Sequence, residues 1–115
     1  MVDKEHLIQL QKAVLRNANL MGVNFSGADL SNADLSDANL SGANLNGANL
    51  SNALLCETEL SGAILSGANL TNANFSGAVL RKTDFNGARF KDADLRNADL
   101  HAARLDGAIL ENAKR

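Results

Sequence analysis

Hydrophobic positions recur every five residues along this chain, and the spacing does not change from one end to the other. Leu or Phe stands at every fifth position from Leu15 to Leu110, and the residue two positions earlier is Ala except at Val23, Thr58 and Thr83. A period of five matches neither the 3.6 residues of an α-helix nor the two of a flat β-strand. The pattern therefore predicts a repeat architecture in which the Leu or Phe and the small residue of each unit point inward.

The other three positions of each unit are mostly polar, which agrees with an outward orientation. The residue before the Leu or Phe is mainly Asn or Asp, and the residue after it is often Ser. All nine glycines lie two positions after the Leu or Phe, and Asn or Asp fills most other instances of that position. Gly, Asn and Asp tolerate the positive φ required at the third residue of a type II turn. Each unit is predicted to be a short extended piece followed by a corner.

A longer period appears when every fourth corner is compared. One series of corners is entirely glycine, and the next series is Asn or Asp throughout (Gly27, Gly47, Gly67, Gly87 and Gly107; Asn32, Asn52, Asn72, Asp92 and Asn112). Equivalent residues stack directly above one another in a solenoid, so a super-period of twenty residues means four units per turn. We expect an all-β solenoid, a four-sided parallel β-helix of about five coils spaced ~4.8 Å apart.

Residues 1 to 12 stand outside the strict repeat. Asp3 has the right chemistry to cap a short helix there, with one apolar face made by Leu7, Leu10 and Val14. Solenoids need their first exposed coil covered. We predict a helical N-terminal cap over residues 1–12, with a partner-binding helix as the alternative, and the repeat domain over residues 13–115.

Three runs of the sequence carry a family resemblance: Ala28-Asp29-Leu30-Ser31-Asn32, Ala38-Asn39-Leu40-Ser41-Gly42 and Ala98-Asp99-Leu100. They match the pattern A-[D/N]-L-x-x, and the chain resembles the pentapeptide-repeat family over about residues 13 to 115. The resemblance implies a right-handed four-sided β-helix. Functional residues in this family follow no fixed motif, so the resemblance assigns none here.

The overall composition excludes several kinds of function. The formal net charge of −2 argues against general attraction to nucleic acid or to an anionic membrane. The N-terminus lacks the apolar core of a signal peptide, and no apolar run approaches membrane-spanning length. We therefore expect a cytoplasmic protein with no membrane contact and no direct nucleic acid binding.

Residues with catalytic or metal-binding chemistry are few and scattered. His6 and His101 lie near opposite ends of the chain, and Cys56 is the single cysteine. Cys56 has no basic partner in its own unit that could activate its thiol, and its neighbours Glu57 and Glu59 are acidic. We predict no catalytic, cofactor or metal site, no cofactor, and no enzymatic activity.

The outward polar columns are predicted to serve the fold. Stacked Asn side chains can bond along the ladder and satisfy backbone groups at the corners. Cys56 is expected to stack between Ser36 and Ser76 as a solvent-facing substitute for serine.

Charge is distributed unevenly along the chain. Between residues 17 and 80 there are five acidic residues and no basic one, whereas residues 81 to 115 carry eight basic and six acidic residues. Twenty residues apart, Asp84 should stack under Arg104, and Lys91 under Glu111, as exposed ion pairs.

The acidic body contains one stack of like charges. Asp37 lies twenty residues before Glu57, and we expect no neutralising partner for the two. With Asp34 they form a candidate acidic interaction face; a merely solvated surface is the alternative.

The C-terminal coil is the other candidate surface. No helix or aromatic cluster follows Leu110 in the sequence. An uncovered parallel edge invites pairing, so Ile109, Leu110 and Asn112 are predicted to form the edge of an end-to-end homodimer. The alternative is that the terminal Lys114 and Arg115 block such pairing.

Three functions compete. A non-catalytic protein-interaction or scaffold module, with a protein partner, fits the regular surface best. The family resemblance suggests a DNA-mimicking inhibitor or protector of DNA gyrase, a type II topoisomerase. A ~24 Å length of duplex would carry ~14 negative charges, however, whereas the net charge of this chain is only −2. A polysaccharide-cleaving enzyme would need charged residues clustered on long loops, and no loop breaks the register.

Overall fold

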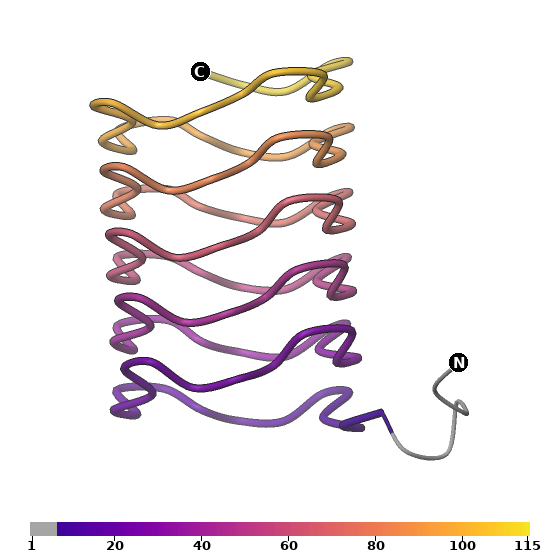
Figure 1. Cartoon of the computed structure of the whole chain (residues 1–115), viewed down its shortest axis with the longest axis vertical. Helices are drawn as coiled ribbons and strands as arrows, with labels where there is room; N and C mark the ends of the chain where they lie inside the picture. The colour runs from indigo at the N-terminus through magenta and orange to yellow at the C-terminus, as the bar shows by residue number, and fades with distance from the viewer. Residues whose placement is uncertain (1–6) are drawn as a thin grey trace.

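The computed structural model describes residues 7–115, which wind into one continuous stack of coils (Figure 1). Neither a helix nor an extended strand occurs in this range; each five-residue unit instead contributes one residue to isolated parallel β-bridges. Every bridge joins residues that are 20 positions apart, from Gln9 and Asp29 to Asp94 and Lys114. One turn of the coil is therefore 20 residues long, as the glycine and asparagine columns predict.

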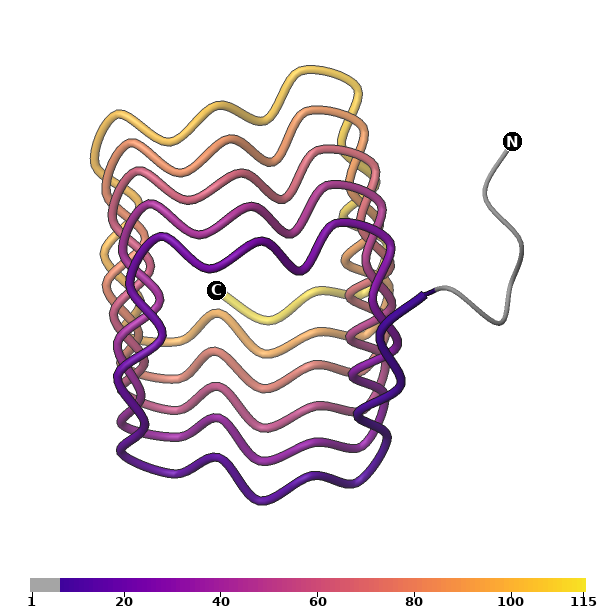
Figure 2. The same ribbon diagram turned by 60° about the horizontal axis from the view of Figure 1, so that its bottom comes forward.

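The bridges fall into four columns, and the coil seen from its end has a four-sided outline (Figure 2). We number the four faces by their outward, bridged residues, and give each corner the number of the face it follows. Face 1 carries Gln9, Asp29, Asn49, Asn69, Arg89 and Ile109; face 2 carries Val14, Asp34, Leu54, Asn74, Asp94 and Lys114; face 3 carries Asn19, Asn39, Glu59, Val79 and Asp99; face 4 carries Asn24, Asn44, Ile64, Asp84 and Arg104.

The corners have one backbone conformation throughout. The residue two after each inward Leu or Phe has a positive φ, which ranges from 58° at Lys82 and Asn112 to 71° at Gly87 and Gly107. The next N–H bonds back to the Leu or Phe carbonyl, as from Ala13 to Leu10 at 3.0 Å. These are the features of a type II turn. Asn, Asp, Lys, Glu and even Ala102 adopt the same φ, so glycine is favoured here but is not required.

The interior is built from the predicted inward residues. Between Ala28 and Ala93 the inward Leu, Phe and Ala side chains are buried and form one apolar core. Phe75, Phe85 and Phe90 pack together, with ring centroids 4.9 to 6.2 Å apart.

Two threonines replace alanine in this core without leaving a polar group unsatisfied. The Thr58 hydroxyl donates to the Leu35 carbonyl, and the Thr83 hydroxyl donates to the Leu60 carbonyl, each at 2.8 Å. Both acceptors lie 23 residues earlier, so each threonine ties its coil to the preceding one.

The start of the chain differs from the predicted helical cap. Residues 7–12 form a bend, the Gln9 bridge and a turn, and are not helical. Leu10 lies in the five-residue register and packs against the core, while Val14 points outward and is 77% exposed. Pairing with the next coil thus overrides the local helical spacing. Asp3 lies outside the described residues.

Candidate functional site

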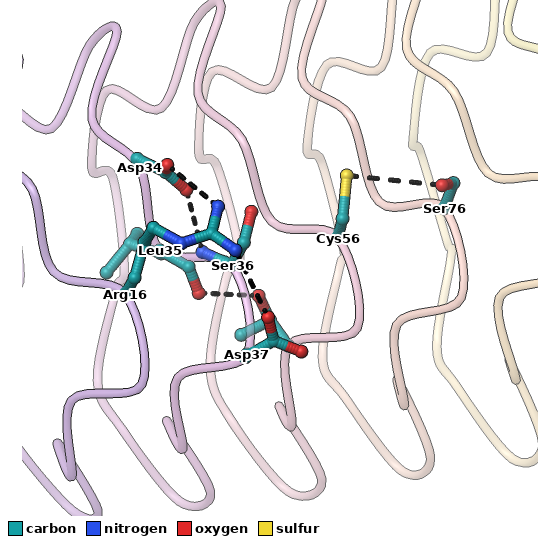
Figure 3. A network of polar contacts seen from close by, with 8 residues as sticks. Arg16, Asp34, Leu35, Ser36, Asp37, Cys56 and Ser76 are labelled. Carbon is teal, nitrogen blue, oxygen red and sulfur yellow. Dashed lines mark hydrogen bonds and ion pairs between the residues drawn. The ribbon is translucent and has the colours of Figure 1, made fainter.

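The predicted acidic interaction face lies on face 2 and its corner, and Figure 3 shows two of its residues, Asp34 and Asp37. Asp34 is an outward residue of face 2, while Asp37 and Glu57 occupy the positive-φ position of corner 2 in successive coils, with φ of 62° and 59°. The backbone of each residue is bonded to a neighbouring coil: Asp34 bonds to the preceding coil, and Asp37 and Glu57 each donate to the following one. The structure therefore places the three carboxylates in neighbouring coils on one side of the rod.

Asp34 is held by its own corner. Its Oδ1 accepts the Ser36 N–H at 3.0 Å, and its Oδ2 accepts from the Arg16 guanidinium at 3.2 Å. The pKa of Asp34 is lowered, chiefly by the hydrogen bond from the Ser36 backbone, then by the Ser36 hydroxyl and Arg16, while burial opposes the shift. Asp34 is thus an ionised and oriented carboxylate.

Asp37 does have a neutralising partner, contrary to the prediction from sequence. The Arg16 guanidinium lies 3.5 Å from the Asp37 carboxylate and so spans Asp34 and Asp37 together (Figure 3). The Glu57 carboxylate lies over Gly77 in the next coil, where any Cβ would collide with it. Arg16 therefore neutralises the Asp37 end of the like-charge stack, while Gly77 leaves room for the Glu57 carboxylate.

The ion pairs between coils do not follow the vertical stack at 20 positions that the sequence suggested: Arg16 and Asp37 are 21 positions apart, and the other two pairs among the described residues lie on a diagonal. Arg16 pairs with Asp34, and Arg81 reaches Asp99 at 3.7 Å; the two members of each pair are 18 positions apart. Across the described residues, neither Asp84 with Arg104 nor Lys91 with Glu111 forms an ion pair, although Asp84 and Arg104 are bridged. A long side chain on a corner reaches back along the extended piece of the following coil.

The outward Asn and Asp side chains largely serve the corners, as predicted. Each typically accepts the N–H two residues later, as Asn39 does from Ser41 at 3.0 Å. Bonding along a column also occurs, from Asn72 to Asn52 at 3.1 Å. These side chains are therefore part of the turn architecture.

Cys56 stacks beside Ser76 in the serine column of corner 2, as predicted (Figure 3), and its side chain is partly exposed. The Ser76 hydroxyl donates to its Sγ at 4.0 Å.

Among residues 7–115, no group of three His, Cys, Asp or Glu side chains is arranged to hold a metal ion. His101 lies on corner 3 and is exposed, and His6 falls outside the described range. In that same range no helix is long and apolar enough to cross a membrane.

The predicted dimer edge lies on the last coil. Ile109 is an exposed residue of face 1 and is bridged to Arg89, Leu110 points inward and is half-buried, and Asn112 forms a corner with φ of 58°. Pairing of this edge with a second chain stays a prediction.

Solved structures similar to this chain are themselves pentapeptide-repeat proteins. One (Rfr23) from the cyanobacterium Cyanothece 51142 is 31% identical over 88% of this chain and 86% of its own, with a TM-score of 0.71. One (alr5209) from Nostoc Pcc 7120 is 38% identical over 96% and 86%, with a TM-score of 0.60. A third, from the Arabidopsis thaliana thylakoid lumen, is 31% identical over 86% of this chain, which spans 66% of that protein, with a TM-score of 0.69.

A more distant likeness, to the plasmid-mediated fluoroquinolone resistance protein QnrB1, has 21% identity and a TM-score of 0.39 and carries no argument about function. A search of curated proteins finds no match. The family model for pentapeptide repeats (8 copies) matches residues 9–37, 33–72 and 73–112. These matches cover most of the chain and agree with the right-handed quadrilateral β-helix of such proteins, so the chain belongs to the pentapeptide-repeat family.

Proposed function

We propose that this protein is a non-catalytic, rigid β-helical scaffold that binds a protein partner through the acidic corner formed by Asp34, Asp37 and Glu57. The observation that carries the proposal is the fixed placement of these carboxylates by consecutive coils of an unbroken repeat. A surface that is already ordered loses little conformational entropy when it binds. Pentapeptide-repeat proteins are in general structural rather than enzymatic, which supports the non-catalytic part of the proposal.

The surroundings of the acidic corner suit a basic and partly apolar partner. The side chain of Asp37 is 45% exposed and that of Asp34 is 22% exposed. Leu54 is an exposed apolar residue bridged to Asp34 on face 2. Arg16 already spans Asp34 and Asp37, which indicates that the spacing of the two carboxylates fits a guanidinium. A partner segment with Arg or Lys beside an apolar side chain would complement this corner.

The experiment is a pull-down with the intact protein and with the D34N/D37N/E57Q variant. Asn at position 34 keeps the side-chain oxygen that caps the Ser36 N–H, so the corner should remain folded. The matched control, D84N/D92N/D106N, removes three carboxylates elsewhere on the rod. We expect the first variant to lose the partner and the control to keep it. Equal capture by both variants would contradict the acidic corner as the binding surface.

Gyrase protection by DNA mimicry has less support. The net charge is only −2, and Arg16 neutralises part of the most acidic region. A supercoiling assay with purified gyrase tests it directly: under the scaffold proposal, the protein neither inhibits nor protects the enzyme. The expected cytoplasmic location stays part of the proposal.

A further inference from the structure

The charged residues of face 1 are placed so that, if a second copy of the column ran in the opposite direction, each acidic residue would lie opposite a basic one. Reading up the column, Asp29 is followed by the uncharged Asn49 and Asn69 and then by Arg89, and consecutive members are joined by bridges. The acidic residue and the basic residue therefore lie at equal distances from the midpoint between Asn49 and Asn69. The outer members of the column, Gln9 and Ile109, are uncharged.

We propose that face 1 is a self-association surface, on which a second copy of this chain lies antiparallel to the first. A twofold axis between Asn49 and Asn69 sets Asp29 opposite Arg89 of the partner copy, twice in the dimer, and sets the two asparagines opposite each other. The same axis keeps corner 1 facing corner 1, with Ser31 opposite Lys91 of the partner copy. No like charges meet on this face.

The remaining faces lack this complementarity when they are paired in the same antiparallel way. On face 2, Asp34 would lie opposite Asp94 of the partner copy. On face 3, Glu59 would lie opposite Glu59 of the partner copy, because it is the middle residue of that column. On face 4, Asp84 and Arg104 would meet the uncharged Asn44 and Asn24. Like charges directly opposite each other disfavour association, so charge selects face 1.

Both charged groups of face 1 are placed to make the contact. Arg89 is exposed, and it belongs to none of the ion pairs in the described part of the chain. The Asp29 carboxylate accepts hydrogen bonds from the Ser31 hydroxyl at 2.7 Å and from the exposed Gln11 side chain at 3.0 Å. These contacts, with the Ser31 N–H at 3.0 Å, fix the position of a partly exposed carboxylate, whose further lone pairs the guanidinium of the partner copy would use.

The association is weak and sensitive to salt. The molecule extends only 35 × 29 × 21 Å, so one face offers a small contact, whereas stable interfaces bury roughly 1,200 Å² or more. Its charge pairs lie near solvent and are screened with a Debye length of about 8 Å at physiological ionic strength. A covalent trap is therefore a better probe than size measurement alone. The proposal does not depend on the acidic corner, which lies at corner 2.

The test uses two full-length single-cysteine proteins in a C56S background, one carrying N49C and the other N69C. Leu54, Ile64 and Val79 occupy the equivalent outward position on other faces, so this position tolerates residues other than Asn or Asp. Under mild oxidation at low salt, the mixture should form the mixed disulfide about tenfold faster than either protein forms its own disulfide, because the axis opposes position 49 to position 69. Circular dichroism confirms that both proteins are folded.

Charge reversal is the second arm. Introducing R89D into both proteins should slow the mixed disulfide about tenfold, and adding D29R to both should restore it. The matched control is a face 4 pair, N44C with D84C, which should show no preference for the mixed disulfide. Equal rates for the mixed and single pairs of face 1, absence of any disulfide, or no response to R89D would each overturn the proposal. A dimer that persists in the R89D variant, in which like charges would meet on face 1, would point instead to the edge formed by Ile109, Leu110 and Asn112.

Discussion

The middle coils and the end coils of this rod contain the same inward residues in the same backbone conformation, yet they differ in burial. Leu45 and Leu105 both follow face 4 and precede glycine corners with φ of 67° and 71°. Leu45 is 0% exposed, whereas Leu105 is only partly buried against the core. The difference arises because a coil seals its interior against the coils above and below it. Burial in this protein is therefore a property of neighbouring pairs of coils.

The largest expected effect comes from opening a cavity in a middle coil. Leu45→Ala should lower the free energy of unfolding by about 2–5 kcal/mol, because the fully buried side chain leaves a void that its neighbours cannot fill. Leu105→Ala should cost less than half as much, since its side chain already meets solvent. Urea unfolding of both variants measures the difference. Equal losses would mean that the end coil is as tightly sealed as the middle.

A smaller effect is expected from overpacking the alanine column. Ala43 is fully buried, so Ala43→Leu should destabilise the protein by about 1–3 kcal/mol. Ala103 lies in the same column of the last coil and is only partly buried, so Ala103→Leu should be close to neutral. Thermal melts of the two variants provide the comparison. A neutral Ala43→Leu would contradict the close packing of the middle coils.

The buried hydroxyl of Thr58 tests whether polar contacts also tie the middle coils together. Thr58→Val removes the bond to the Leu35 carbonyl but keeps the shape, and should cost about 1 kcal/mol. Thr58→Ser keeps the hydroxyl and serves as the control, with a smaller loss. The Leu35 carbonyl still accepts the Ala38 N–H, which limits the cost of Thr58→Val. Chemical denaturation measures the free energy of unfolding of both variants. A valine variant more stable than the serine variant would contradict a stabilising role for the buried hydroxyl.

The smallest effect concerns pH and the charged end of the rod. Arg96 holds the pKa of Asp94 down to about 2, chiefly by a side-chain hydrogen bond and then by its backbone N–H. A carboxyl whose folded pKa is depressed stabilises the fold above its unfolded pKa of about 3.9, and this contribution is lost as pH falls toward 2. Asp94→Asn should therefore lose less stability between pH 5 and pH 2 than the parent chain does. An unchanged acid profile would show that the pair contributes nothing to stability.

Much of the fold could be predicted from residue spacing because each structural rule recurs at a fixed interval along the chain. The inward pair, the positive-φ corner and the 20-residue turn each leave a mark at a fixed interval, and the structure confirms all three. The candidate site was predicted less completely. Asp34, Asp37 and Glu57 can be grouped from their positions, but vertical stacking at 20 residues does not identify Arg16 as a partner, because its pairs span 18 and 21 positions. The signal that identifies it is the 18-residue spacing shared by Arg16 and Asp34 with Arg81 and Asp99.

The sequence by itself determined which side of the chain faces inward and how many units make a turn, because these depend only on residue type and interval. The tertiary structure decided what lies between coils. It drew residues 7–12 into the stack rather than a helix, since the bonds to the next coil outweigh a local helical spacing. It also directed long side chains along a diagonal, and it left the inward residues of the last coil partly exposed for want of a neighbour above them. Contacts between coils depend on side-chain reach in three dimensions, which a one-dimensional period does not contain.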